Sequence, residues 1–432
     1  MTYPEAIQFL YGLRLLGAKF GLENTYKLAA LAGNPQNQLR FIHVAGTNGK
    51  GSTCAMLESI YRAAGLRVGL FTSPHLVSFR ERIQVNRRLI PETEVVRLVT
   101  KMRPLLKQFP ANHHPTFFEA VTVMALKFFA DQKCDLVIWE TGLGGRLDAT
   151  NIVTPLASVI TNIQFDHQQW LGDTLAKIAA EKAGIIKPGV PVITAADEPE
   201  ALKVIEEVAR GKNALLEIVT VNDANSRLAG TFALSLSGEH QKLNAALALA
   251  TIKVLQNKIP VSEENIRAGL QSVTWPGRLQ LVTRPSGQKI LLDGAHNVAG
   301  AKVLREALGK IFPATKRTLI LGVLQDKDWP QICRTLAPLA SRIFTVPVSS
   351  ERTANPGQLA AACRTANSSA EIFACDSLRD ALGKMTNDDF TVITGSLYLV
   401  GEALELLGLF PVNINERGLN EWTATPSAPA SR

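Results

Sequence analysis

A run of glycine, lysine and hydroxyl side chains near the amino terminus has the composition of a phosphate-binding loop. It reads GTNGKGS over residues 46–52, after an apolar stretch at 39–45 that predicts a buried strand and before a predicted helix at 53–65. Glycines let backbone N–H groups converge on an anion, and the helix N-terminus adds partial positive charge. Lys50 would reach the terminal phosphates of a nucleotide, and Ser52 or the next hydroxyl could bind Mg²⁺ carried by them.

The loop departs from the strict P-loop pattern at two positions. That pattern has glycine where Val44 stands and a hydroxyl where Gly51 stands. Taken alone, the run therefore predicts a phosphate-binding loop, with an ordinary glycine-rich turn as the alternative.

Three further apolar runs, at residues 66–71, 134–140 and 155–163, lead into polar side chains. The side chains at or after their ends are Ser73, Glu140 and His167. Ligands bind at the carboxyl ends of strands in open α/β sheets, so we expect these groups to form one polar rim on a mostly parallel sheet. An acid at such a position is an expected Mg²⁺ ligand, and a carboxylate that caps the next turn is the alternative.

Composition restricts the class of protein. The 432 residues predict two or three α/β domains, and 46% of them are hydrophobic. We expect neither a membrane span, which needs ~18 consecutive apolar residues, nor a signal peptide. The five cysteines are scattered without paired spacing, which is typical of reduced thiols in a cytoplasm. The net charge of +8 is spread along the chain, so it favours an anionic small substrate at least as much as nucleic acid.

Helix and strand patterns divide the chain into two units. Residues 1–284 predict the larger domain, with short strands and turns over 215–236. The alternation of strands and helices restarts after Pro285, so residues 285–412 predict a smaller domain. Residues 413–432 are polar with Ser, Pro and Ala, and we expect a disordered tail.

Several longer motifs carry a family resemblance over residues 39–398. They are GTNGKGS at 46–52, TSPHL at 72–76, ETGLGGRLDATN at 140–151, FDH at 165–167, EKAGIIK at 181–187, WPGR at 275–278 and LDGAHN at 292–297. With these motifs the chain resembles the folylpolyglutamate synthases and bifunctional dihydrofolate synthases of the Mur ligase superfamily. That superfamily uses the shorter phosphate loop, so the missing first glycine fits the resemblance.

The resemblance implies an N-terminal P-loop ATPase domain with a mostly parallel sheet and a smaller C-terminal Rossmann-like, glutamate-ligase domain. ATP would phosphorylate a substrate carboxylate to an acyl phosphate, which the amine of L-glutamate then attacks. The implied acceptors are dihydropteroate and the γ-carboxylate of reduced folates. A monomer is implied, with neither nucleic acid nor membrane as a partner.

The resemblance also implies a metal and catalytic set. Ser73, Glu140 and His167 would hold Mg²⁺, with two ions expected; whether a monovalent cation such as potassium is also required stays open. Imidazole is an unusual ligand for Mg²⁺, so a structural, hydrogen-bonded His167 is the alternative. Lys182 corresponds to a lysine carried as a carbamate; a surface partner for Glu181, or an ammonium that binds phosphate, are the alternatives. Lys50, His167 and Lys182 are thus the expected catalytic residues.

Nucleotide contacts are implied for one set of residues: Gly49, Lys50, Gly51, Ser52, Asn244, Arg278 and Asp293. The amide of Asn244 can pair with an adenine edge, and Arg278 would touch phosphate when the domains close. Asp293 suits ribose or adenine, or else forms the turn before Gly294. His296 could bind glutamate or pack.

Two segments resemble the dihydropteroate-binding segments of the bifunctional enzymes. Their residues are Thr116, Phe117, Phe118, Glu119, Leu147, Asp148 and Ala149. Aromatic rings offer a stacking face to a pterin, and a carboxylate can pair with its N–H groups, whereas ordinary helix core is the alternative for the two phenylalanines. We therefore expect a bifunctional enzyme, with a polyglutamate-only enzyme as the alternative.

Two remoter classes are disfavoured. A peptidoglycan Mur ligase typically carries an N-terminal nucleotide-sugar domain, for which about 40 residues before the loop are too few. A nucleic-acid-dependent NTPase would give no role to the second domain.

Overall fold

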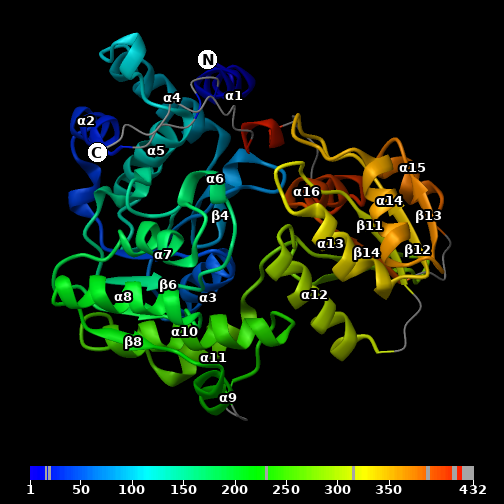
Figure 1. Ribbon diagram of the computed structural model, residues 1–432. Coiled ribbons are helices and arrows are strands. Elements are labelled where there is room, and N and C mark those ends of the chain that lie inside the picture. The colour runs from blue at the N-terminus through cyan, green and yellow to red at the C-terminus, as the bar shows by residue number, and fades with distance from the viewer. Residues whose placement is uncertain are drawn as a thin grey trace.

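Each half of the chain is organised around its own β-sheet, and the two halves lie side by side in the computed structural model (Figure 1). The structure describes residues 1–14, 17, 21–228, 232–313, 317–385, 390–410 and 416–420. None of the described helices is long and apolar enough to cross a membrane.

The N-terminal sheet has eight strands in the order β4-β3-β2-β5-β1-β6-β7-β8. Its strands are β1 (Phe41–Ala45), β2 (Val68–Phe71), β3 (Ile83–Val85), β4 (Arg88–Leu89), β5 (Leu136–Glu140), β6 (Ala157–Ile160), β7 (Val192–Thr194) and β8 (Leu216–Ile218). Six neighbouring strands pair in parallel, in the order β2-β5-β1-β6-β7-β8. Strands β3 and β4 extend the β2 edge as an antiparallel hairpin. The expected mostly parallel sheet is therefore confirmed.

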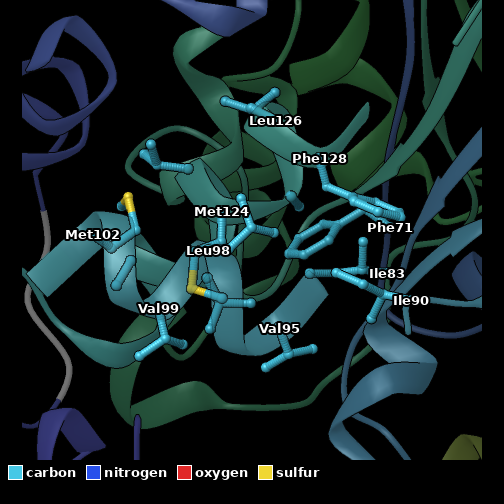
Figure 2. Close-up of a cluster of buried hydrophobic side chains, with 14 of the residues drawn as sticks. Phe71, Ile83, Ile90, Val95, Leu98, Val99, Met102, Met124, Leu126 and Phe128 are labelled. Atoms are coloured by element: carbon cyan, nitrogen blue, oxygen red, sulfur yellow. The ribbon is translucent and has the colours of Figure 1, made fainter. Parts of the chain in front are cut away.

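Helices cover both faces of this sheet, which explains why its central strands are apolar throughout. One face packs on α3 (Lys50–Ala63), α10 (Glu239–Leu255) and α11 (Glu263–Ser272). The other packs on α1 (Tyr3–Arg14), α4 (Glu92–Leu106) and α5 (Phe117–Asp131). Successive strand side chains alternate between the two cores. Figure 2 shows the second core, where Phe71 of β2 lies among side chains of α4 and α5.

The remaining helices of this domain follow the polar strand ends or lie at the periphery. They are α2 (Glu23–Leu31), α6 (Gln168–Leu171), α7 (Leu175–Ala183), α8 (Pro199–Gly211) and α9 (Val221–Leu228). Helix α9 lies where short strands were expected; of the residues described there, only β8 is a strand, so that prediction is mostly wrong.

The C-terminal sheet has six strands in the order β13-β12-β11-β14-β10-β9, parallel except for the β9–β10 pair. Its strands are β9 (Gln280–Thr283), β10 (Lys289–Leu292), β11 (Arg317–Leu321), β12 (Arg342–Thr345), β13 (Glu371–Ala374) and β14 (Phe390–Thr394). Its helices are α12 (Val298–Ile311), α13 (Trp329–Leu336), α14 (Pro356–Ala366), α15 (Leu378–Gly383) and α16 (Leu397–Leu406). The second, smaller α/β unit is thus confirmed.

Strand β9 corrects the predicted domain boundary. Its residues pair with β10, Gln280 opposite Leu292, so a boundary after residue 284 falls inside a hairpin of the second sheet. The Arg284-Pro-Ser-Gly sequence is the hairpin turn rather than the linker. The connection between the sheets is instead the segment from the end of α11 to β9, residues 273–279.

Two segments join the domains. Leu76 and Val77, which follow β2 of the first sheet, belong to the hydrophobic core of the C-terminal domain. Residues Arg417–Asn420 form a short 3-10 helix, η6, that lies beside α1, and Leu419 is buried in the N-terminal core (Figure 1). The predicted disorder from residue 413 onward is therefore wrong for 416–420, while 413–415 and 421–432 lie outside the described residues.

Candidate active site

A cavity of about 1090 Å³ lies between the domains, above the carboxyl ends of the parallel strands. The phosphate loop, Ser73, Glu140 and His167 line it from the N-terminal domain. Arg278 and Asp293 line it from the C-terminal side. The expected polar rim is confirmed, because the strands that lead to these residues are neighbours in the order β2-β5-β1-β6.

Two glycines of the loop stand at positions where a residue with a side chain would not fit. Gly46 has φ 146° and lies so close to Thr161 that a Cβ would stand 1.8 Å from its hydroxyl oxygen. Gly49 has φ 84° and is the N-cap of α3, where a Cβ would stand 2.4 Å from Asn244 Oδ1. The loop therefore holds its shape only with glycine, and α3 presents its N-terminus to the cavity.

The two departures from the strict P-loop pattern have structural causes. Val44 is a strand residue in register with Glu140, so β1 extends through the position where the longer loop has glycine. A Cβ on Gly51 would lie 2.8 Å from the ring of Trp275 in the interdomain linker. The loop and the linker are thus too close at this position for the serine or threonine of the strict pattern.

Lys50 and Lys182 both donate hydrogen bonds to the loop backbone. Lys50 Nζ donates to Gly46 O at 3.0 Å and to Thr47 O at 3.1 Å. Lys182 Nζ, on α7, donates to Gly46 O at 2.7 Å. Burial, with a smaller contribution from the Lys50 charge, lowers the pKa of Lys182 to about 7. A substantial neutral fraction of this amine therefore exists at neutral pH.

The neighbours of Lys182 exclude one of its alternatives. Its side chain is buried, and Glu181 instead pairs with Arg146 at 2.7 Å. Lys182 is therefore not a surface partner for Glu181.

Glu140 is a buried carboxylate with few hydrogen bonds to offset the loss of its hydration. Its Oε2 accepts one hydrogen bond, from Ser73 N at 3.0 Å, and Oε1 has no hydrogen-bond partner among the described residues. Burial raises its pKa to about 7 despite the nearby charge of Lys50. A buried carboxylate with an oxygen facing the cavity suits a cation, and its neighbour Ser73 offers a hydroxyl oxygen, so the pair fits Mg²⁺.

His167 reaches the same cavity with a strained backbone. Its φ of 49° is unusual for a residue with a side chain. Burial lowers its pKa to about 3, so the imidazole is neutral at physiological pH. Within the described chain, no group of three or more His, Cys, Asp or Glu side chains is arranged to hold a metal ion.

Asp166 is a site residue for which sequence reasoning assigned no role. It lies in the N-terminal domain, yet its carboxylate is 2.6 Å from Lys327 Nζ and 3.1 Å from Asn297 Nδ2 of the C-terminal domain. Both charged side chains are under 9% exposed. This buried ion pair joins the domains directly beside His167; FDH was recognised as a motif, but nothing in the sequence linked it to Lys327.

The expected nucleotide residues lie at the cavity, and several also hold structure. Asn244 donates to Gln241 at 2.9 Å, and Gln241 in turn donates to Ser52 Oγ at 3.3 Å. Asp293 accepts from Leu279 N and Ala295 N, each at 2.9 Å, so it does form the turn that was its alternative role. Burial lowers the pKa of Arg278, whose guanidinium lines the cavity.

His296 is held within its own turn. Its Nδ1 lies 2.7 Å from Gly294 O, and its Nε2 lies 3.8 Å from the Asp166 carboxylate. The ring therefore packs at the domain interface, and it also lines the cavity.

The expected pterin segments form another part of the cavity wall. All seven residues line it: Thr116, Phe117, Phe118, Glu119, Leu147, Asp148 and Ala149. Thr116 and Glu119 also form a capping box at the start of α5. Phe117 is a core residue, as its alternative predicted, whereas Phe118 is only partly buried.

Asp148 is the carboxylate of this wall, and local hydrogen bonds fix it. Its Oδ2 accepts from Leu143 N at 2.7 Å, and its Oδ1 accepts from the backbone and hydroxyl of Thr150. The same hydroxyl lies 2.9 Å from Nε2 of His43, a fully buried residue of β1. A buried polar chain therefore runs from the phosphate-loop strand to the part of the cavity wall that contains Asp148.

Comparison with known proteins agrees with this geometry. Residues 44–252 match the Mur ligase middle domain, and residues 277–397 match the Mur ligase glutamate ligase domain. The chain is 37% identical to the dihydrofolate synthase/folylpolyglutamate synthase of Bacillus subtilis, over 93% of this chain and 98% of that protein. It is 35% identical to the enzyme of the same name from Escherichia coli, over 93% and 94% of the two chains.

Solved structures give the same result. Mycobacterium tuberculosis folylpolyglutamate synthase, complexed with ADP and AMPPCP, is similar with a TM-score of 0.85 at 30% identity, over 95% of this chain and all of that chain. Escherichia coli FolC in complex with DHPP and ADP is similar with a TM-score of 0.81 at 31% identity, over 95% and 98%. The chain therefore belongs to the folylpolyglutamate synthase/dihydrofolate synthase family of ATP-dependent Mur ligases.

Proposed function

We propose that this enzyme is bifunctional, joining L-glutamate first to dihydropteroate and then to the γ-carboxylate of reduced folates. One observation carries the proposal: a single cavity contains the phosphate loop, Glu140 and a wall with Phe118 and Asp148. A substrate with a pterin at one end and a carboxylate at the other could span these parts. The names of the relatives from Bacillus subtilis and Escherichia coli support both activities.

The residues around the loop suit phosphoryl transfer to a carboxylate. Two anions, the terminal phosphate and the acceptor carboxylate, must approach each other, so their charge has to be neutralised. Lys50 and the N-terminus of α3 lie on the phosphate side of the cavity and would supply part of that neutralisation. Mg²⁺, when bound, would supply the rest.

We assign Ser73, Glu140 and His167 as the residues that would hold Mg²⁺. The buried Glu140 carboxylate and the Ser73 hydroxyl are hard oxygen donors, and the neutral His167 imidazole can accept a bond from a metal or from its bound water. A second ion is placed toward Lys182, provided that this lysine becomes a carbamate.

Carbamylation of Lys182 is chemically accessible at this position. The neutral amine attacks CO₂, forms an N–C bond and loses one proton, which leaves an anion in place of a cation. The depressed pKa supplies the neutral amine, and a nearby Lys50 would pair with the product. We expect Lys182→Ala to lose activity, and short carboxylates added in solution to restore part of it; failure of every carboxylate would count against the carbamate.

The site is completed by two domains of one chain, so we also propose that the protein is a monomer, which size-exclusion chromatography with light scattering tests. We further propose a cytoplasmic location, without nucleic-acid or membrane partners.

Product analysis tests the proposed function. The purified protein is incubated with ATP, L-glutamate and either dihydropteroate or tetrahydrofolate, and products are identified by mass together with ADP release. A bifunctional enzyme adds glutamate to both acceptors. If only tetrahydrofolate is extended, the enzyme is a folylpolyglutamate synthase alone. If neither acceptor leads to ADP release, the proposal is overturned.

A further inference from the structure

A buried guanidinium in the cavity wall has no role in the site described so far. Arg82, the last residue of the 3-10 helix η2 (Phe79–Arg82), is 4% exposed and lines the cavity. Its Cζ lies 5.4 Å from the centre of the Phe117 ring. Arg82 therefore stands beside the aromatic part of the proposed pterin wall.

Two of the three guanidinium nitrogens of Arg82 are held by the protein. Nε donates to His75 Nδ1 at 2.9 Å, and Nη2 donates to Asn420 Oδ1. Nη1 has no hydrogen-bond partner among the described residues. Burial lowers the pKa of Arg82 to about 10, which still leaves it charged at neutral pH. Because Arg82 lines the cavity, Nη1 leaves a charged donor for a ligand bound there.

The residues that hold Arg82 are themselves fixed by the C-terminal segment. Because Arg82 donates to Nδ1 of His75, the proton of that imidazole is on Nε2, which donates to Glu416 O at 2.9 Å. Asn420 Nδ2 donates to His75 O at 2.9 Å. Residues 75, 82 and 420 thus form a closed ring of hydrogen bonds, and His75 connects this ring to Glu416.

The C-terminal segment, residues 416–420, is anchored to both domains. The Glu416 carboxylate accepts from Tyr3 Oη and Ser78 Oγ, each at 3.0 Å, and from Phe79 N. Arg417 pairs with Glu405 of α16 in the C-terminal domain. A Cβ on Gly418 would lie 1.9 Å from Tyr11 Oη, so the segment packs closely against α1. Leu419 and Asn420 line the cavity, so the segment is part of the site wall.

We propose that Arg82 is a substrate-binding residue whose Nη1 donates to an oxygen of the pterin-bearing acid, and that Asn420 is its positioning residue. This assignment rests on the proposed function. The shared chemistry is an oxygen acceptor, which the substrate offers in two places, the oxo group of the pteridine ring and the carboxylate. In both cases the C-terminal segment acts on pterin affinity and leaves nucleotide binding alone.

The first test separates pterin binding from nucleotide binding. Asn420→Ala should raise the KM for dihydropteroate roughly 5- to 50-fold, because a hydrogen bond to a charged group is lost, with the Kd for ATP unchanged. Asn420→Asp keeps an acceptor for Arg82 and should recover most of that loss. The matched control is Asn367→Ala, since Asn367 also donates to main-chain carbonyls, at 2.8 and 3.0 Å, but lies within the C-terminal domain.

The second test identifies the acceptor. Arg82→Lys is compared with wild type for binding of pteroate, its carboxamide, and a 2,4-diamino analogue in which an amino group replaces the ring oxygen. Selective weakening of the two ligands with the ring oxygen assigns that oxygen, and selective weakening of the two carboxylates assigns the carboxylate. Equal weakening of all three, or of none, overturns the role of Arg82.

Other outcomes are equally decisive. Asn420→Ala with an unchanged KM, or with pterin and ATP affinity falling together alongside the melting temperature, would overturn the positioning role. If wild type converts no pterin acid at all, the proposed function fails instead. Amide exchange of Phe79, which donates to Glu416, reports the docking of the segment independently of any turnover.

Discussion

The two ends of the cavity are built in different ways. The phosphate end comes from one contiguous loop and the strand ends beside it, and backbone geometry imposed by glycines fixes it. The other end, where we propose that the pterin binds, is assembled from η2, α5, the segment around Asp148 and the C-terminal segment, which are distant in the chain. Local sequence therefore specifies the first end, whereas tertiary structure specifies the second.

Lys50→Ala should give the largest effect and confine it to the phosphate end. Without the ammonium over the loop, we expect ADP formation to fall by about 10³-fold or more with every acceptor, because charge neutralisation is lost. Pterin binding measured directly should stay near wild type. Lys242→Ala, which removes a surface lysine paired with Glu239, is the control, and normal turnover by the Lys50 variant would contradict the assignment.

Lys327→Ala should disturb both ends of the cavity and lower turnover, because it breaks the ion pair with Asp166 that joins the domains. Loss of one partner leaves a buried charge, which in other proteins costs about 3–5 kcal/mol. Rehydration of Asp166 requires the domain interface to open, so we expect turnover to fall about 10²-fold and the radius of gyration from X-ray scattering to rise. Lys384→Ala breaks an exposed pair, with Asp380, and should change neither quantity.

His43→Gln probes the buried chain that links the two ends. Burial lowers the pKa of His43 to about 3 in the folded protein, against 6.5 for an unperturbed histidine. Below pH 6.5 the unfolded state takes up a proton that the folded state does not, so stability is full above that pH and falls as the pH drops toward 3. From pH 7 to pH 5 this one group should cost roughly 2 kcal/mol of unfolding free energy.

The pH dependence of the His43→Gln variant, measured by urea unfolding at the two pH values, should be flatter than wild type by that amount. Equal slopes would mean that His43 is protonated in the folded state. His113 lies on the surface, so His113→Gln serves as the control.

Gly51→Ala should give the smallest effect of the series. The added methyl group would stand 2.8 Å from the Trp275 ring, so the linker ring has to shift. We expect a several-fold weaker ATP affinity and a change in tryptophan fluorescence. Gly309→Ala, in α12 with no atom near the added methyl, is the control, and an unperturbed fluorescence spectrum in the Gly51 variant would argue against the contact.

The same contrast explains what sequence reasoning could supply. The four central strands and the gathering of their polar ends at one edge of the sheet followed from apolar runs, because buried parallel strands leave continuous apolar segments. Glu140 was identifiable since an acid closes such a run. Local pattern was also enough to expect α3, as the predicted helix at 53–65.

Other features required the folded chain. Nothing near Asp166 in sequence indicates Lys327, and nothing near Arg82 indicates Asn420, because such contacts join segments 161 and 338 residues apart. The polar composition after residue 413 predicted disorder, yet Glu416 and Asn420 are buried because hydrogen bonds satisfy them. The boundary prediction failed because a turn sequence within a hairpin has the same composition as a linker.

Leu76 and Val77 bear on how the molecule can be divided. They follow a strand of the first sheet but are at most 9% exposed within the hydrophobic core of the second domain, where Gly401 of α16 touches the Leu76 carbonyl. If the gene were divided at the linker, the N-terminal fragment would expose Leu76 and Val77 to solvent. The C-terminal fragment would have a cavity in its core where these side chains pack. Each fragment would then be prone to aggregate, and co-expression of the two pieces, rather than either alone, is the route by which a split enzyme would reassemble.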